Sequence, residues 1–220
     1  MSRGRPAPPP RRARRLPWKQ LELVSLDFEA TGLDFARDTI VSFGVVPIRG
    51  GRIDVGSAVY ELVDPGDVPP SPESVTVHGL RPVDLRGAQG LDAARASLGG
   101  LVAERFLVTW AGHVEAGFLD VLYGGGERSW LRRCIDAREL MLAVDEDPPI
   151  PFTLSAVAER FGVPVASPHH ALDDALVTAQ VFLIAAARLA ARGVTTVRKL
   201  QATRRVEPPI LRRPRGPIRR

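Results

Sequence analysis

The sequence predicts an α/β fold, in which a central mixed sheet carries helices on its faces. Two observations support this prediction. Three apolar, β-branched runs with short connections come first, which is typical of an antiparallel meander. From residue 91 onward, segments with helical spacing alternate with short apolar runs. With 220 residues and 45% hydrophobic residues, the chain can bury one sizeable core.

The first predicted strand, residues 21–33, ends in two carboxylates, Asp27 and Glu29. Leu23, Val24 and Leu26 make both faces of this run apolar before the carboxylates, which indicates a buried central strand. Residues two apart on a strand share a face, so Asp27 and Glu29 project side by side about 6–7 Å apart. Two ionised carboxylates this close repel each other, and a bound cation would relieve the repulsion.

The later elements follow from hydrophobic spacing and from glycine and proline stops. We expect strands at 39–47, 57–63, 106–110 and 133–136, and helices at 74–78, 91–104, 114–123, 137–144, 152–161 and 171–192.

Charge divides the chain into three parts. Residues 1–20 hold seven Lys/Arg and no acid, and residues 198–220 hold nine Lys/Arg and one acid, Glu207. Within a total of +5, residues 21–197 therefore carry −10. We expect a Pro- and Arg-rich disordered tail at 1–17, a folded domain at 18–193 and a basic tail at 194–220. The tails are either polyanion-binding arms or a compositional bias with solvated charges.

The chain offers one cysteine, Cys134, which has no internal disulfide partner. We therefore expect a reducing compartment, and place the protein in the cytoplasm. No apolar run approaches about 18 residues, so no transmembrane helix and no membrane partner are expected. The charged N-terminus is not followed by the apolar segment of a signal peptide.

Several motifs in order resemble the DEDDh 3′–5′ exonucleases, the DnaQ-like proofreading nucleases of the ribonuclease H-like superfamily. These motifs are DFEATG at 27–32, VHGL at 77–80, FTLSAVAERFGVP at 152–164 and HHALDDALVTA at 169–179. The resemblance implies a ribonuclease H-like fold with a five-stranded mixed sheet, in which three antiparallel strands are followed by two parallel ones.

The resemblance also implies a two-metal site. Asp27 would bridge two divalent cations, Glu29 would hold one of them, and Asp174 would close the site, while His169 would deprotonate the attacking water. Hard Mg²⁺ or Mn²⁺ suits such carboxylates, and a pair of these ions suits phosphodiester hydrolysis. The family spacing His-x-Ala-x-x-Asp favours His169 over His170.

The same spacing favours Asp174 over Asp173 as the ligand, because Ala171 fixes the register. The middle motif, LVTWAGHVEAGFLDVLY at 107–123, departs from the family pattern. In one register Glu115 replaces the usual metal-binding aspartate, and Trp110 replaces the usual histidine. In the rival register His113 is the motif histidine, and no acid remains.

We therefore expect a 3′–5′ exonuclease that releases nucleoside monophosphates from 3′ ends of single-stranded DNA or RNA. The alternative is a degenerate exonuclease fold that binds nucleic acid or a partner protein without cleaving it. The resemblance implies that the turn after the carboxylates approaches the terminal nucleotide, with simple turn chemistry as the alternative for Thr31. For His78 the preferred interpretation is a structural turn residue before Gly79, and the alternative is a position near the substrate. The expected substrate contacts are Phe28, Ala30, Thr31, Gly32 and His78.

Overall fold

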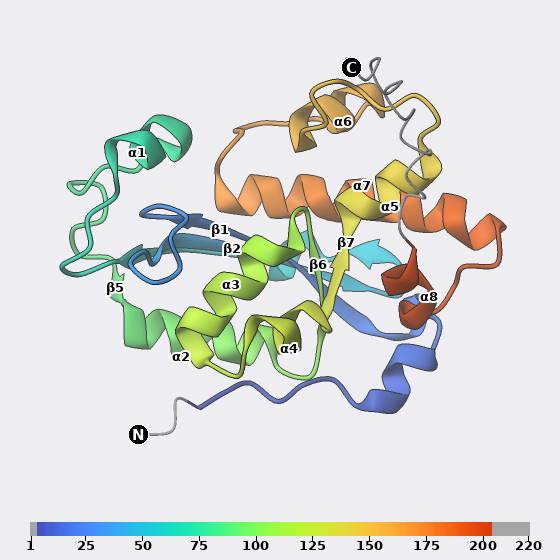
Figure 1. Cartoon of the computed structure of the whole chain (residues 1–220), viewed down its shortest axis with the longest axis horizontal. Helices are drawn as coiled ribbons and strands as arrows, with labels where there is room; N and C mark the ends of the chain where they lie inside the picture. Colours follow the sequence, from blue (N-terminus) through green and yellow to red (C-terminus); the bar gives the residue numbers. More distant parts are fainter. Residues whose placement is uncertain (1–3, 204–220) are drawn as a thin grey trace, which may run out of the picture.

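The computed structural model describes residues 4–203, and its centre is a mixed sheet built around β1 (Glu22–Ala30). β1 pairs antiparallel with β2 (Ile40–Arg49) and parallel with β6 (Phe106–Thr109). Outside these lie β4 (Val59–Asp64), antiparallel to β2, and β7 (Cys134–Asp136), parallel to β6. These five strands are the predicted three antiparallel and two parallel strands of a ribonuclease H-like sheet (Figure 1).

Two short strands extend this sheet to seven, in the order β5-β4-β2-β1-β6-β7 with β3 beside β2. β3 (Arg52–Ile53) and β5 (Gln89–Gly90) each contain two residues. The prediction missed both as separate strands, because two residues cannot show an alternating pattern.

Helices cover both faces of the sheet, as predicted (Figure 1). One hydrophobic core lies under α2, α3 and α4, and the other lies under α5, α6, α7 and α8. The bounds are α2 (Leu91–Val102), α3 (Gly112–Tyr123), α4 (Glu127–Leu131), α5 (Ala137–Val144), α6 (Leu154–Arg160), α7 (Ala171–Ala191) and α8 (Val197–Ala202). The short helices α4 and α8 were not predicted.

α1 (Pro72–His78) stands at one end of the sheet, beside the residues that follow β1 (Figure 1). Ser71 caps it by accepting a hydrogen bond from the Ser74 N–H, and Gly79 ends it with φ of 75°. The Ser71 N–H and the Ser74 hydroxyl both donate to the Thr31 carbonyl. These bonds fix α1 against the turn after the two carboxylates.

α7 is the one described helix that is long and apolar enough to cross a membrane, judged by length and composition. Half of its apolar window is buried, and the helix packs on β1 and β2. This is the environment of a core helix, whose buried face is apolar and can give the helix the composition of a membrane span. The cytoplasmic location stays a prediction.

The expectation of a disordered segment at 1–17 is wrong for the part that the structure describes. Residues 11–15 form a 3₁₀ helix that buries Ala13, and the Glu104 N–H donates to the Ala7 carbonyl at 2.7 Å. The Arg5 guanidinium lies over the Trp130 ring, 4.9 Å from its centroid. The buried Ala13, the backbone hydrogen bond to Ala7 and the stack of Arg5 on Trp130 therefore hold this segment in place, although its composition predicts disorder.

The folded part also extends past the predicted boundary at residue 193. Pro17 and Thr196 form an isolated antiparallel bridge, and the Trp18 N–H donates to the Thr195 carbonyl at 3.0 Å. Val197 and Leu200 of α8 are buried in the core under α7. The remainder of the predicted basic tail, 204–220, lies outside the described residues.

Candidate active site

Asp27 and Glu29 face the α7 side of the sheet. Their neighbours on β1 divide between the two cores, since Leu23 packs on the α7 side while Leu26 and Phe28 pack on the α3 side. Alternation along the strand places the two carboxylates with Leu23. The β1–β2 register shifts between Glu29 and Ala30, so an irregularity ends the regular pairing directly after the second carboxylate.

The start of α7 lies directly against β2 at the level of Asp27. Gly44 is the β2 partner of Asp27, and a Cβ at Gly44 would overlap the backbone of Ala171, the first residue of α7. A glycine inside a strand commonly marks such a close approach of another backbone. The missing side chain therefore lets the first turn of α7, which carries Asp174, reach the carboxylates of β1.

Asp27, Glu29 and Asp174 form a cluster in which one carboxylate oxygen of each lies within 4.8 Å of the others. The exposed fraction of Glu29 is 8%, and Asp27 and Asp174 are half-buried. Three carboxylates this close form a set of hard oxygen donors of the kind that binds divalent cations. The structure thus brings together three of the four acids that we expected to bind metal.

Burial raises the pKa values of all three carboxyl groups, and repulsion within the cluster raises those of Asp27 and Glu29 further. Burial raises the pKa of Asp27 well above its usual range, and the charges of Glu115, Glu29 and Asp174 raise it further. Burial, with the charge of Asp174, raises the pKa of Glu29 to about 8. Burial also raises the pKa of Asp174, against the hydrogen bond from the His169 N–H. The ionised cluster therefore lacks a counter-charge of its own.

Glu115 points into the protein from the first turn of α3. Its exposed fraction is 4%, and its Oε2 has no hydrogen-bond partner among the described residues. Burial raises its pKa to about 8. Of the charged groups that act on Asp27, Glu115 has the largest effect, although it lies outside the 4.8 Å cluster. An unpartnered buried carboxylate oxygen beside this cluster is a natural cation ligand.

The two registers of the middle motif differ in which residue they place at the carboxylates, Glu115 or none. His113 is exposed, and Phe118 packs in the α3-side core. Trp110 follows β6 and stacks on Phe152, with ring centroids 5.7 Å apart and planes 25° apart. The structure therefore brings Glu115 to the carboxylates and leaves His113 at the surface, while Trp110 packs against the α7-side core.

The two adjacent histidines have different surroundings. His169 is exposed and has φ of 61°, and its N–H donates to Asp174 Oδ2 at 3.1 Å. His170 stacks on Tyr60 with centroids 4.2 Å apart, and its buried Nδ1 has no hydrogen-bond partner within residues 4–203. The backbone of His169 is thus tied to a cluster carboxylate while its imidazole stays accessible.

His78 is fixed by both of its ring nitrogens. The Leu80 N–H donates to Nδ1 at 3.0 Å, so Nε2 carries the proton and donates to the Ala30 carbonyl at 3.2 Å. Burial lowers the pKa of His78, and the nearby charge of His169 lowers it further. His78 is therefore a neutral side chain that is held against the strand carrying the carboxylates.

A cavity of about 370 Å³ opens beside the carboxylates, between β1, α1 and α3. Most of the predicted substrate contacts line it, namely Phe28, Ala30, Gly32 and His78, together with Glu29. Thr31 does not line it. The exposed fraction of Thr31 is 1%, and its hydroxyl donates to Asp38 and accepts from the Thr39 N–H. The Thr31 side chain therefore serves the turn, which was the alternative explanation.

Several residues of this region were missed. The cavity wall also contains Leu33, Ser71, Glu73, Ser74, Val77, Val114 and Phe118. They come from three separate segments, and no local pattern links them. Gly44 did carry a signal, because a glycine within an apolar strand indicates close packing of another backbone.

The sheet has the ribonuclease H-like arrangement, and the carboxylate cluster with its adjoining cavity fits the site of a nuclease. The exonuclease family (RNase_T) matches residues 24–182. The chain therefore belongs to the exonuclease family, and we assign it as a nuclease hydrolase.

The similar proteins fall into longer polymerase-related chains and solved exonucleases. The chain is 30% identical over 183 residues to the PolC-type DNA polymerase III of Thermotoga maritima, covering 81% of this chain and 13% of the relative. It is 30% identical over 198 residues to a DNA polymerase III subunit epsilon-like protein of Rhodobacter capsulatus, covering 82% of this chain and 26% of the relative. The chain therefore spans only a small part of these relatives.

Two solved structures share the fold. Exonuclease I of E. coli in complex with a dT13 oligonucleotide superposes with a TM-score of 0.68 at 16% identity, over 79% of this chain and 43% of that one. The nuclease domain of 3′hExo, a DEDDh family member bound to rAMP, gives 0.58 at 19% identity, over 78% of this chain and 92% of that one.

Proposed function

We propose that the protein is a 3′–5′ exonuclease that hydrolyses phosphodiester bonds at the 3′ ends of single-stranded DNA or RNA and releases nucleoside monophosphates. The observation that carries this proposal is the cluster of Asp27, Glu29 and Asp174 at the end of the central strand. The solved relatives bound to dT13 and rAMP support a nucleic-acid ligand.

The donor set fits two divalent cations, Mg²⁺ or Mn²⁺. Asp27, Glu29 and Asp174 would hold them, and the unpartnered Oε2 of Glu115 would add a fourth carboxylate. All four residues offer oxygen, which hard cations prefer, and none offers sulfur. Such ions, when bound, activate a water and stabilise the charge that develops on the leaving oxygen.

His169 is the candidate general base. Its side chain is exposed at the mouth of the site, and the bond from its N–H to Asp174 Oδ2 holds it beside the cluster. An imidazole can accept a proton from an attacking water near neutral pH. His170 is less suited, because its ring is stacked on Tyr60 and one nitrogen is buried.

The cavity beside the cluster would receive the terminal nucleotide. Val77 and Phe118 supply apolar wall, and His78 supplies a ring whose orientation is fixed by two hydrogen bonds. About 370 Å³ lies within the usual range of small-molecule sites. Because Glu29 lines this cavity too, a nucleotide seated there would place its phosphate beside the carboxylates.

A degenerate exonuclease fold that binds without cleaving is the second candidate. The observation that favours it is the position of Glu115 outside the 4.8 Å cluster, in a chain whose family uses the shorter aspartate there. Incubation of a 3′-labelled and a 5′-labelled single strand with Mg²⁺ or Mn²⁺ separates the two candidates. Stepwise shortening from the 3′ end that Asp27→Ala abolishes supports the exonuclease. Binding without shortening under either metal refutes it.

A further inference from the structure

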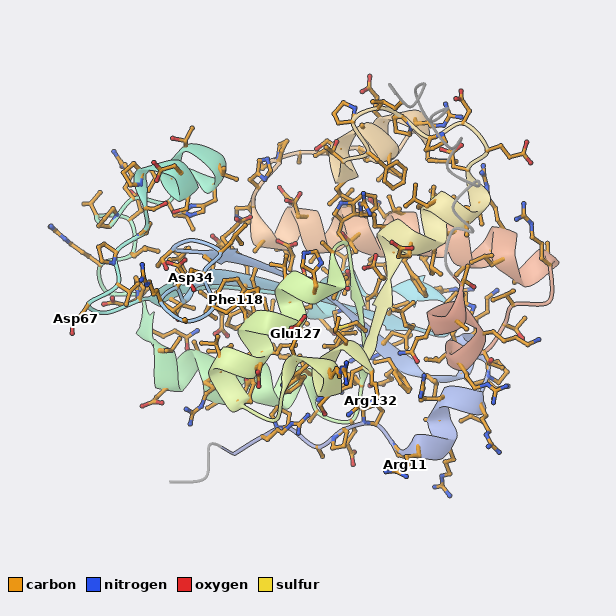
Figure 2. All side chains as sticks on the ribbon, viewed as in Figure 1. Arg11, Asp34, Asp67, Phe118, Glu127 and Arg132 are labelled. Atoms are coloured by element: carbon orange, nitrogen blue, oxygen red, sulfur yellow. The ribbon has the colours of Figure 1, made fainter. Side chains whose placement is uncertain are left out.

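Six arginines from three separate segments gather on one side of the molecule. They line two cavities of about 500 and 510 Å³, which adjoin because Arg14 and Arg132 line both. Figure 2 shows Arg11 and Arg132 on neighbouring parts of the surface, away from Phe118 of the nucleotide cavity. We name this surface the arginine face; its residues are Arg11, Arg14, Arg15, Arg128, Arg132 and Arg198.

The positive charge of the arginine face is not neutralised within the described residues. None of the six guanidinium groups forms an ion pair with a carboxylate of residues 4–203, whereas seven other arginines do so. Arg14 donates to the neutral Gln201 Oε1 at 2.9 Å. The other five side chains belong to exposed residues. Six unpaired arginines on one surface attract a polyanion.

A seventh arginine lies buried beneath this surface. Arg133 is 2% exposed and lines the same cavity as Arg11 and Arg198, and its Nε and Nη1 have no partner among the described residues. Its Nη2 donates to the carbonyls of Val102 and Arg105. A buried cation without a carboxylate partner adds to the field of the face above it.

The three segments of the arginine face are fixed to one another. The bridge between Pro17 and Thr196 joins the N-terminal segment to the start of α8. The Gln201 Nε2 donates to the carbonyls of Arg132 and Cys134, at 3.1 and 2.9 Å. The arginines are therefore presented by rigid backbone, so less conformational entropy is lost on binding than with a free tail.

The face continues towards the active site along the outer edge of β7. The cavity of about 500 Å³ is lined by Arg128 and Arg132 at one end and by Gly112 and His113 at the other. Gly112 and His113 lie at the start of α3, which carries Glu115. Two acids, Asp136 and Glu139, line the same end, and Asp136 is engaged by the N–H groups of Gly112 and Glu139.

Strand register gives the distance from Arg133, the buried arginine beneath the face, to the site. The Leu107 N–H donates to the Arg133 carbonyl, so Arg133 is level with Leu23 of β1, four residues before Asp27 and two strands away. With about 3.3 Å per residue and about 4.8 Å per strand, the separation is about 16 Å. A stacked strand rises about 3.4 Å per nucleotide, so this corresponds to about five nucleotides.

We propose that the arginine face binds the phosphate backbone of the substrate strand, on the 5′ side of the end that is held at the carboxylates. This inference rests on the proposed exonuclease function. The planar guanidinium fork matches phosphate oxygens. The arginines lie on a surface that continues to the start of α3, which carries Glu115, and this arrangement fits a strand more closely than a separate acidic protein. The face also lacks the apolar stripe of a membrane-bound surface.

The test compares binding in an Asp27→Asn background, which leaves the strand intact. Anisotropy of a labelled 15-nucleotide strand is measured across salt concentrations for this protein, for its Arg128→Gln/Arg132→Gln/Arg198→Gln derivative and for an Arg86→Gln derivative. Arg86 is the matched control, because it is exposed and lies next to β5 at the opposite edge of the sheet. Arginines beyond residue 203 are common to all three proteins.

The triple substitution is expected to weaken binding about tenfold or more near 0.1 M salt, and to reduce the slope of log K against log salt by about 2, at about 0.7 per lost phosphate contact. The Arg86 control is expected to stay within about twofold. With Asp27 restored, the triple variant is expected to cleave a trinucleotide at the native rate, because a trinucleotide is too short to span about 16 Å.

Three results would overturn the inference. The first is an unchanged affinity of the triple variant for the 15-mer. The second is a loss of trinucleotide cleavage as large as the loss of 15-mer binding. The third is poly-glutamate binding that is as strong as 15-mer binding and depends equally on the arginine face. The last result would assign the surface to an acidic protein instead. If the protein with Asp27 shortens neither the 15-mer nor the trinucleotide under Mg²⁺ or Mn²⁺, but 15-mer binding still depends on the arginine face, the proposed function fails while the face remains a nucleic-acid-binding surface.

Discussion

Replacing Glu29 by glutamine is expected to stabilise the metal-free protein while it removes activity. Glu29 lies in the cluster with Asp27 and Asp174, and burial raises its pKa from 4.5 to about 8. Between these two values the folded state binds more protons than the unfolded state. The free energy of unfolding therefore falls as the pH rises through this window. Glutamine is neutral and nearly isosteric, so it removes this penalty.

The size of the effect follows from the two pKa values. At pH 7.5 the shift from 4.5 to about 8 costs the folded state about 4 kcal/mol, and at pH 5 it costs about 1 kcal/mol. The exposed fraction of Glu29 is only 8%, so solvent screening is weak. Glu29→Gln should therefore stabilise the protein by about 3 kcal/mol more at pH 7.5 than at pH 5, which corresponds to a melting temperature about 6–12 °C higher.

The assay is thermal or urea unfolding in EDTA at pH 5 and pH 7.5. Glu159→Gln is the matched control, because Glu159 is exposed on α6 and forms no ion pair among the described residues. Added Mg²⁺ should narrow the difference between native protein and Glu29→Gln, because the cation binds only the folded cluster. Equal stability of the two proteins at both pH values would refute the reasoning that the cluster is strained by its own charge.

Three further predictions concern the rest of the site. Glu115→Asp is expected to retain or raise exonuclease turnover, since the charge stays and the family's usual side chain is restored; complete loss of turnover would show that the middle-motif register is wrong. His169→Ala is expected to lower kcat about 10²–10⁴-fold, the usual range for a general base. His170→Ala should leave kcat within about tenfold and instead lower the melting temperature, because it removes the stack on Tyr60. A larger loss of kcat in His170→Ala than in His169→Ala would make His170 the general base. Gly44→Val is expected to cost about 3 kcal/mol or more in urea unfolding, because its side chain would overlap the Ala171 backbone; native stability would contradict the close approach of α7.

Much of this architecture is readable in the sequence because its signals are local. Alternation along β1 places Asp27 and Glu29 on one face, and the loop–helix spacing brings His169 together with Asp174. Buried strands and long helices can also be predicted from the spacing of their apolar residues. The position of a residue could therefore be predicted where it depends on that residue's own element.

The features that were not predicted depend on contacts between distant parts of the chain. The cavity beside the carboxylates is assembled from β1, α1 and α3, so no single stretch of sequence describes it. Order in the N-terminal segment depends on Trp130, far along the chain, which the Arg5 guanidinium covers from one side while that of Arg133 lies 4.7 Å from the same ring. Composition correctly identifies a segment with few apolar residues, but it does not register partners contributed by distant parts of the fold.

The Pro17–Thr196 bridge couples two segments that are remote in sequence into one cooperative unit. If the N-terminal segment detaches, α8 loses the backbone that it pairs with, and the arginines of both are released together. A polyanion lying across them would oppose that local opening by mass action. The ends of the fold should then become most resistant to proteolysis and hydrogen exchange when the protein is engaged with its substrate.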